Sequence, residues 1–585
     1  MTFLNQVRAS AIELINDSFP SAQQLSKHEL DEKDGYVAGW SFPSPVEEVS
    51  KFWLLIDAEF PYSVPRVVIK GTSEAMLWPH VESDGRLCLS GDNASIATHE
   101  IKLILDHVLH EACCLLKENS EGLNTEDFVD DFNAYWLRSF DEATTTTRTL
   151  LETTESSIFV RAWHGKSFYF VAENNEKINN WLKNYLGKIE NPTINEAALI
   201  WLKELPTPAK YPSTAREIRI YIKNFSIGGL PIFDKLITAE PNRSVIILMG
   251  KTAKGEIKSF GIELRKPSRI VQGNRKKDLP YNKGFRKGKV PATIITNHYK
   301  IRKTTVKDVN SCSSRLPANI SSVLSKKSVA IVGCGSLGSF VAMQLAQSGV
   351  RNLHLIDFDK MNWENICRHV LGAESIGKFK AESLQTLIKQ RIPQMESVDS
   401  TNSSILTAYA NNAELFNDID LIISLTGDWN SESALNDLQQ AGEITCPIMY
   451  GWMETRAAAT QVVLMNKDNG CLRCGFDDTG APLNSATLWS SDEVNSVCGG
   501  GASIYGSVEL SNASSLVSSL AIDYLTNALE LPVWRTWLGP KHHIYSNGGL
   551  WNPTWIKRYG DPFSGGRLVA NKWPSRVDCL CNRRV

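Results

Sequence analysis

Short runs of apolar and polar positions along the first 145 residues predict a small α+β unit. An amphipathic helix opens the chain, and strand-like runs follow at residues 36–42, at 50–56 and at the end of FPYSVPRVVIK. A loop rich in Gly, Asp and Ser covers residues 82–95, and IKLILDHVLHEACCLLKE then has apolar residues at helical spacing. The order helix, antiparallel strands, loop and helix is typical of an α+β fold.

The middle of the chain, residues 148–310, is expected to form an α+β linker domain. Strand-like runs (SIFVRAW, FYFVA, SVIILMG, KSFGIEL) alternate with runs that we expect to be helical, such as INEAALIWLKEL. The stretch at residues 265–289 is basic and rich in Gly, Pro and Asn, which favours a solvated loop over a docking surface for an acidic partner. No motif in this segment indicates a chemical reaction.

The last segment, residues 311–585, alternates helix and strand through SVAIV, NLHLIDFD, DLIISLTG and PIMYGW. This alternation predicts a doubly wound, Rossmann-like parallel sheet. The expected domains are therefore 1–147, 148–310 and 311–585.

Composition restricts the partners and the location. The chain has 585 residues, too many for one hydrophobic core, and its net charge of −2 requires neither a nucleic-acid nor a membrane partner. The amino-terminal helix contains Glu13 and Asp17 and lacks the long apolar core of a signal peptide, so the expected location is the cytoplasm. Twelve cysteines in such a chain are expected to be thiols, metal ligands or nucleophiles and not disulfides.

A glycine-rich turn follows the strand SVAIV directly. Gly333, Gly335 and Gly338 form G-C-G-S-L-G, a helical run comes next, and Asp357 ends the following strand. Glycine lets the backbone turn tightly and approach a phosphate, and the helix amino terminus presents free N–H groups to the anion. The motif in this context predicts a nucleotide site, and taken alone it favours NAD.

Charged side chains beside this turn favour a triphosphate over a dinucleotide. Arg368 and Lys380 follow the second strand, and Asp428 follows a later strand, where a carboxylate could hold Mg²⁺. A dinucleotide already meets its pyrophosphate at the helix amino terminus, whereas attack on an α-phosphorus develops charge that such cations neutralise.

These motifs resemble the adenylating domain shared by ubiquitin-activating enzymes and the ThiF/MoeB activators of sulfur carriers. The resemblance implies that Asp357 binds the ribose, that Asp428 holds Mg²⁺, and that Arg368, Lys380 and Asp428 are catalytic. The implied nucleotide-binding set is Gly333, Gly335, Gly338, Asp357, Asp359, Asn365, Arg368, Lys380 and Asp428. His369 stands where many members have Gln, and Arg315 is the candidate for the arginine that reaches the partner's site in the usual homodimer.

Five further cysteines are candidates for chemistry in this segment. Cys498 lies in the glycine-rich NSVCGGGASIYG before a long apolar helix, and by the ThiF resemblance it is the nucleophile that takes the acyl group. A tetrahedral zinc site is expected from Cys471, Cys474, Cys579 and Cys581, with ordinary free thiols as the alternative because the second pair is CxC.

The first segment resembles the ubiquitin-conjugating fold. WPHVESDGRLCLS places Cys88 where that family has its catalytic cysteine, with His80 in place of the usual Asn. His80 can donate a hydrogen bond to an oxyanion, so catalytic and structural roles both stay open. The alternative for Cys88 is a non-catalytic remnant of the fold.

The order of a conjugating domain, a middle segment and an activating domain is similar to the bacterial CBASS antiviral fusion proteins. The resemblance implies ATP, Mg²⁺ and structural Zn²⁺ as cofactors, and a cGAS-like nucleotidyltransferase as the protein whose carboxyl terminus is activated. Its acyl group would pass from Cys498 to Cys88 and then to an amine of an unknown acceptor, a protein or a small molecule. Two alternatives remain: a sulfur-carrier activator with a non-catalytic amino-terminal binding domain, and an NAD(P)-dependent oxidoreductase.

Overall fold

The computed structural model describes most of the chain, in two compact units. The described residues are 3–26, 28–30, 35–60, 62–69, 77–82, 84–89, 101–139, 145–152, 154–187, 191–267, 271–272, 275–276, 281, 285–286, 289–309, 317–477, 479–490, 505–579 and 581. One unit joins residues 1–173 with 193–307, and the other joins 174–192 with 308–585. No helix in this part of the chain combines the length and the apolar character that crossing a bilayer requires.

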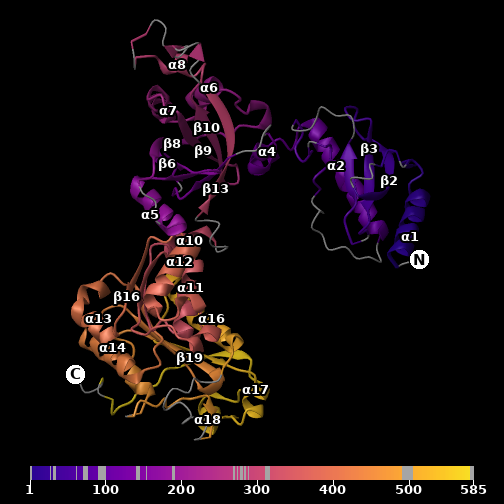
Figure 1. Cartoon of the computed structure of the whole chain (residues 1–585). Coiled ribbons are helices and arrows are strands. Elements are labelled where there is room, and N and C mark those ends of the chain that lie inside the picture. Colours follow the sequence, from indigo (N-terminus) through magenta and orange to yellow (C-terminus); the bar gives the residue numbers. More distant parts are fainter. Residues whose placement is uncertain are drawn as a thin grey trace. The chain divides into compact units, whose positions relative to one another are not determined.

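The amino-terminal domain is an antiparallel sheet packed against helices, as the sequence pattern predicts (Figure 1). Trp40, Leu54 and Val67, from three neighbouring strands, are buried in one core with Leu105 and Leu116 of the long helix. The elements are α1 (Phe3–Ser18), β1 (Gln23–Gln24), β2 (Tyr36–Pro43), β3 (Lys51–Asp57), β4 (Arg66–Ile69), α2 (Ile101–Glu121), α3 (Asp127–Asp130) and α4 (Phe132–Arg138).

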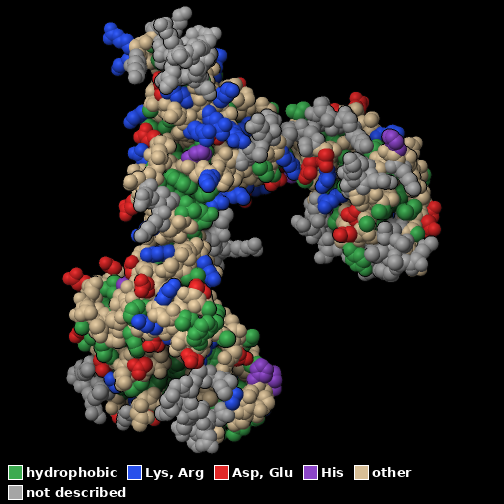
Figure 2. Space-filling model, in the orientation of Figure 1, with side chains coloured by type: hydrophobic (Ala, Val, Ile, Leu, Met, Phe, Trp, Pro, Cys, Tyr) green, Lys and Arg blue, Asp and Glu red, His purple; other side chains and the backbone are tan. Residues whose placement is uncertain are grey.

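The middle of the chain forms a closed barrel with helices on its outside. The barrel strands run in the order β10-β13-β5-β7-β6-β8-β9. Lys and Arg side chains gather over this region on the face that Figure 2 shows. The strands are β5 (Thr146–Thr149), β6 (Ile158–His164), β7 (Phe168–Ala172), β8 (Ile194–Leu202), β9 (Arg243–Lys251), β10 (Ile257–Arg265) and β13 (Lys300–Asp308), and the helices are α6 (Ala215–Phe225), α7 (Gly229–Thr238) and α8 (Ala292–Ile295).

The prediction of a helix for INEAALIWLKEL is wrong, because the first nine residues of this run form strand β8. Ala197 and Leu199 face the barrel interior, while Ala198 and Ile200 pack under α6 and α7. Burial of both faces produces a continuous apolar run without period-two alternation, and such a run cannot be told from a buried helix by periodicity. Much of the basic stretch at residues 265–289 lies outside the described residues.

The carboxyl-terminal unit contains an eight-stranded sheet in the order β16-β15-β14-β17-β18-β19-β21-β23. Its first five strands are parallel, as predicted, while the last three pair antiparallel, which the sequence pattern did not indicate. The strands are β14 (Ser328–Val332), β15 (Asn352–Ile356), β16 (Ser397–Thr401), β17 (Leu421–Ser424), β18 (Ile448–Met453), β19 (Ala459–Met465), β21 (Val533–Leu538) and β23 (Arg567–Asn571).

Helices cover both faces of this sheet, which confirms the Rossmann-like class. Alternate residues of β14 enter two cores: Val329 and Ile331 pack under α11, α12 and α16, whereas Ala330 and Val332 pack under α13 and α14. Helix α5, although it precedes β8 in the chain, belongs to this unit because Asn180 and Asn184 donate to backbone carbonyls at residues 393–396. The helices are α5 (Asn175–Leu186), α10 (Ala318–Leu324), α11 (Ser336–Gln347), α12 (Lys380–Arg391), α13 (Ile405–Asn411), α14 (Trp429–Ala441), α16 (Ser507–Thr526), α17 (Lys541–Ser546) and α18 (Pro553–Tyr559).

Candidate functional site

The predicted nucleotide residues lie at one edge of the sheet. The glycine turn follows β14, Asp357 follows β15, and Asp428 comes four residues after β17. Because these three strands are neighbours and parallel, their carboxyl ends meet at that edge. The topology therefore brings together residues that lie almost 100 positions apart in the sequence.

The glycine turn is held by Asp357 and by close backbone packing. The Cys334 N–H donates to Asp357 Oδ2 at 2.7 Å, and the Asp359 N–H donates to Asp357 Oδ1 at 2.7 Å. A Cβ on Gly338 would lie 1.8 Å from the Gly333 carbonyl oxygen, so that position admits only glycine. Burial raises the pKa of the Asp357 carboxyl above its ordinary value.

Alanine substitutions in the glycine turn should separate an effect on folding from an effect on nucleotide binding. Gly338→Ala is expected to lower the free energy of unfolding by about 1–3 kcal/mol, since the new methyl group overlaps a backbone oxygen. Gly335→Ala should lower the melting temperature less, by the small effect expected of alanine at a helix N-cap, because nothing lies within 4 Å of a Cβ there. It should nevertheless weaken ATP binding if the backbone approaches a phosphate. Calorimetry and ATP titration of both variants check this. Equal melting temperatures would contradict it.

His369, in place of the usual Gln, supports the same turn. Its Nε2 lies 2.7 Å from the Cys334 carbonyl oxygen, and its Nδ1 accepts from the Leu371 N–H at 3.1 Å. One nitrogen therefore donates and the other accepts, which defines the neutral tautomer with the proton on Nε2. Burial lowers the pKa of His369 to about 4, so the ring stays neutral at physiological pH.

Lys380 and Asp359 form an ion pair beside the turn. Lys380 Nζ donates to Asp359 Oδ2 at 2.9 Å, and the Lys380 N–H donates to the Asp359 carbonyl at 2.9 Å. The Lys380 side chain is only 9% exposed, whereas that of Asp359 is 53% exposed. A buried ammonium needs a partner, and this one is held at the start of α12 with its partner open to solvent.

Asn365, Arg368 and Asp428 lie on the short segments around this edge. Asn365 Oδ1 accepts from the Asn362 N–H at 3.2 Å, and the Arg368 guanidinium lies 5.8 Å from the centre of the Tyr505 ring. Asp428 caps α14 by accepting from the Ser431 N–H at 2.9 Å. Its hydrogen bonds from Ser431 lower the pKa of the Asp428 carboxyl, so it is a full anion suited to a divalent cation.

Two residues of this region escaped the sequence analysis. Glu432 is buried and accepts from Thr426 Oγ1 and the Gly427 N–H, which fixes the turn before Asp428, and burial raises its pKa to about 8. Tyr505 shares a hydrogen bond of 2.7 Å with Ser336 Oγ at the start of α11. No motif marks Glu432, and Tyr505 lies in the quoted NSVCGGGASIYG without having been singled out. Tyr505 also lines a cavity of about 370 Å³ together with Trp489, Trp537, Arg456, Glu509 and His543.

The proposed activating-domain nucleophile, Cys498, lies outside the described residues, and so does Arg315. Both remain predictions from the resemblance. Tyr505 and the first turn of α16 follow the segment that contains Cys498 in the chain.

Two pairs of cysteines, more than 100 residues apart in the sequence, come together in the carboxyl-terminal unit. The Sγ atoms of Cys471, Cys474, Cys579 and Cys581 all lie within 4.8 Å of one another. The distance is 3.8 Å between Cys471 and Cys579 and 3.6 Å between Cys474 and Cys581, too long for disulfides. Four sulfurs at about 2.3 Å from a central Zn²⁺ would be about 3.8 Å apart, so the cluster fits a tetrahedral zinc ion.

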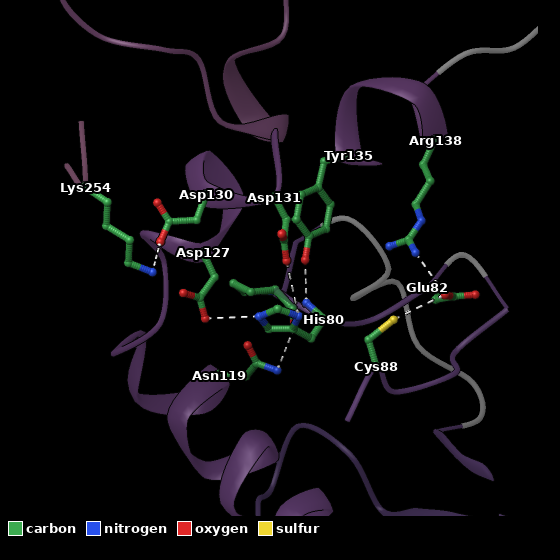
Figure 3. Close-up of polar contacts among 11 residues, drawn as sticks. His80, Glu82, Cys88, Asn119, Asp127, Asp130, Asp131, Tyr135, Arg138 and Lys254 are labelled. Atoms are coloured by element: carbon green, nitrogen blue, oxygen red, sulfur yellow. Dashed lines mark hydrogen bonds and ion pairs between the residues drawn. The ribbon is translucent and has the colours of Figure 1, made fainter. Parts of the chain in front are cut away.

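Cys88 lies in a tight loop beside the amino-terminal sheet. Val81 and Leu87 pair as an isolated bridge, and the Cys88 N–H donates to the His80 carbonyl at 2.8 Å. Cys88 Sγ donates to Glu82 Oε1 at 3.3 Å (Figure 3). Burial, followed by the hydrogen bond and charge of Glu82, raises the pKa of the Cys88 thiol above its ordinary value.

The His80 ring points to acidic residues of α3 and its flank, away from Cys88 in Figure 3. Its Nε2 lies 3.1 Å from Asp127 Oδ2, and its Nδ1 lies 3.9 Å from Asp131 Oδ2. His80 has a φ of 59°, which is rare for a residue with a side chain, and its N–H donates to the Tyr135 hydroxyl at 2.6 Å. Asn119 Nδ2 donates to the preceding Pro79 carbonyl at 3.1 Å. The backbone at His80 is thus fixed from several sides.

Arg138 is a further charged residue beside Cys88. Its Nη2 donates to Glu82 Oε1 at 2.9 Å. Neither Glu82 nor Arg138 is among the residues predicted from the sequence. Glu82 lies between His80 and Cys88 and could have been noticed as an acid near a thiol, but nothing in the sequence connects it to an arginine 56 positions later.

Comparison with known protein families finds a match in the carboxyl-terminal part of the chain and another in the amino-terminal part. Residues 314–531 match the ThiF family, and residues 18–145 match Prokaryotic E2 family B. The chain therefore joins an E2-like domain to a ThiF domain, and the expected fusion is confirmed.

The ubiquitin transferase-like relative and the adenylyltransferase and sulfurtransferase relative each align with only part of this chain. An ATP-dependent ubiquitin transferase-like protein Cap2 of Pseudomonas aeruginosa is 30% identical over 26% of this chain and 27% of its own length. An adenylyltransferase and sulfurtransferase UBA4 of Meyerozyma guilliermondii is 30% identical over 28% of this chain and 37% of its own. The solved structure of Escherichia coli MccB with ATP aligns at 16% identity and a TM-score of 0.32, over 46% of this chain and 70% of MccB. The chain thus aligns with well under two thirds of the length of either sequence relative.

Proposed function

We propose that this chain, with its E2-like and ThiF domains, activates the carboxyl terminus of a protein with ATP and carries it as a thioester to Cys88 for ligation. The observation that carries the proposal is the convergence of the glycine turn, Asp357, Lys380 and Asp428 at the carboxyl ends of adjacent parallel strands. In doubly wound sheets, ligands bind at this edge.

The residues at this edge supply what adenylation needs. The amino terminus of α11 and the glycine turn bind phosphate oxygens, and Asp357 binds the ribose. Asn365, Arg368 and Lys380 neutralise the charge that develops as the carboxylate oxygen attacks the α-phosphorus and pyrophosphate leaves. Lys380 exchanges Asp359 for a phosphate oxygen, which keeps its buried ammonium paired. Mg²⁺ held by Asp428 would add charge neutralisation at the phosphates.

The acyl group then moves between sulfurs. The Cys498 thiolate attacks the acyl adenylate, a C–S bond forms and AMP leaves. Cys88 attacks that thioester and releases the Cys498 thiol, and an amine of the acceptor finally forms an amide and releases the Cys88 thiol. By the CBASS resemblance, the carried protein is a cGAS-like nucleotidyltransferase, the enzyme is a homodimer with Arg315 near the partner's site, and the role is antiviral defence. The Cap2 relatives support this assignment.

A second candidate is a sulfur-carrier activator whose amino-terminal domain only binds a partner. The relative named an adenylyltransferase and sulfurtransferase favours it. The Glu82 contact to Cys88 Sγ favours ligation instead, because a domain that only binds needs no proton acceptor beside its thiol.

Exchange of labelled pyrophosphate into ATP tests the activation step. The full chain, incubated with Mg²⁺, ATP and a full-length cGAS-like nucleotidyltransferase, should exchange label at a rate that falls to background when the last residues of that protein are removed. Oxidation of NAD(P)H, or reduction of NAD(P)+, that does not depend on ATP would instead support the oxidoreductase alternative. No exchange with the intact protein would overturn the activation step.

The zinc site gives a separate prediction. The full chain should contain about one zinc per chain, and Cys474→Ser should lose it, whereas Cys367→Ser, an exposed cysteine of the same domain, should keep it. At free zinc about 1,000 times the dissociation constant, binding contributes about 4 kcal/mol of stability, so Cys474→Ser should also melt earlier. Metal analysis by mass spectrometry checks this, and a zinc-free wild type would contradict it.

A further inference from the structure

We propose that Glu82 is the general base of the Cys88 site and that Arg138 positions it, an inference that rests on the proposed acyl transfer at Cys88. Glu82 Oε1 lies 3.3 Å from Cys88 Sγ and 2.9 Å from Arg138 Nη2 (Figure 3). A carboxylate oxygen carries two lone pairs, so this one oxygen can accept from the thiol and from the guanidinium at once. The thiol proton is therefore aimed at Glu82 before any reaction starts.

The Cys88 thiol requires such a base. Its pKa is raised by burial and by Glu82 and is lowered only by Arg138, so the group is chiefly an uncharged thiol at neutral pH. The thiolate is the nucleophile, and attack on a thioester therefore needs a group that accepts the proton. Tyr135, a titratable group that interacts electrostatically with Cys88, has its pKa raised to about 12 and stays a phenol.

His80 is poorly arranged for this task. Its ring nitrogens face Asp127 and Asp131, and its contact with Cys88 is made by its backbone carbonyl oxygen. His80 thus fixes the loop, while Glu82 is the described side chain whose carboxylate accepts from the reacting sulfur.

Arg138 connects this site to the barrel. It is the last residue of α4, and Trp136 of the same helix is buried against the outer face of the barrel strands and donates from Nε1 to the Thr304 carbonyl at 3.0 Å. The hydroxyl of Tyr135, on the same helix, accepts from the His80 N–H. The barrel therefore holds the helix that presents Arg138 to Glu82, which gives the motif-free middle of the chain a positioning role.

Glu82 takes up a proton in each of two acyl-transfer steps. When Cys88 attacks an incoming thioester, its S–H proton passes to Glu82 as the C–S bond forms, and the departing thiolate is reprotonated from Glu82 or water. When an amine attacks the Cys88 thioester, a C–N bond forms, the surplus N–H proton passes to Glu82, and the C–S bond breaks. Glu82 then returns the proton to the Cys88 thiolate, which restores the starting state.

A synthetic peptide thioester with mercaptoethanesulfonate as its leaving group tests this without ATP. It loads Cys88 of the full chain directly, and discharge onto free lysine is followed in a single turnover. Glu82→Gln should discharge at least about 100-fold more slowly at neutral pH, the usual contribution of a general base. Asp84→Asn removes an exposed carboxylate of the same loop, which pairs with Arg86, and should stay within about twofold of wild type.

Alkylation of Cys88 by iodoacetamide across pH, read by mass spectrometry, is a second readout that needs no acyl donor. Glu82→Gln should shift the midpoint to lower pH, because Glu82 raises the Cys88 pKa, and Arg138→Met should shift it to higher pH. Loss of structure would expose the thiol in both variants and cannot produce opposite shifts. The role of Glu82 would be overturned if Glu82→Gln discharged the thioester at the wild-type rate, or if both variants shifted the alkylation midpoint in the same direction. Either result would count even where ATP–pyrophosphate exchange succeeds.

Discussion

Replacing Lys380 by methionine is expected to reduce ATP–pyrophosphate exchange by at least about 100-fold, comparable to the loss of one donor that stabilises a developing anion. The Lys380 ammonium is buried at the start of α12, within 2.9 Å of Asp359, at the edge of the sheet where the glycine turn ends β14. Methionine keeps most of the side-chain volume, and the Asp359 carboxylate left behind is half exposed and can be hydrated. The expected loss is therefore chemical, with little change in folding.

The control is Lys378→Met, an exposed lysine two positions earlier. It should exchange label at the wild-type rate, and both variants should melt close to wild type. Equal exchange by the two lysine variants would show that Lys380 does not act on the phosphates.

Replacing Cys88 by alanine is expected to reduce ligation by at least about 1,000-fold, since the residue that bonds covalently to the acyl group is lost. Pyrophosphate exchange should continue, because that step takes place in the ThiF domain. Gel analysis of the acceptor-linked product, alongside exchange measured on the same preparation, separates the two activities.

Cys114→Ala is the matched control, a half-buried cysteine on α2. It should form product at the wild-type rate. Product formed at the wild-type rate by Cys88→Ala would favour the sulfur-carrier activator over the relay.

The convergence of the glycine turn, Asp357 and Asp428 at one edge of the sheet was predictable because the signals are local. Gly333, Asp357 and Asp428 each follow their own strand within four residues, and parallel strands of a doubly wound sheet end at one edge. These residues therefore needed only the strand assignments to be placed together. The cysteine cluster was predictable for a different reason. The short spacing within each cysteine pair is visible in the sequence and is typical of metal ligands. The two pairs are nevertheless distant, since Cys471 lies 108 positions from Cys579 and Cys474 lies 107 positions from Cys581.

The barrel and the environment of Cys88 were not predictable in the same way. Strand β8 is buried on both faces and lacks the alternation that marks a strand, and closure of a barrel depends on pairing between distant strands. Arg138 reaches Glu82 from α4, a helix that Trp136 anchors on the barrel. Such a contact depends on tertiary packing and leaves no periodic signal.

The central claim is that an acyl group activated at the glycine turn reaches the sulfur of Cys88 in the same protein. Mass spectrometry of the Cys88→Ser variant, purified from cells that supply ATP and the natural partners, tests it most directly, because an oxygen ester is more stable than a thioester. An ester between the substituted position and the carboxyl terminus of another protein is expected, and it should be missing from the Cys88→Ser/Lys380→Met double variant. No adduct in either variant, or an adduct that persists in the double variant, would contradict the relay.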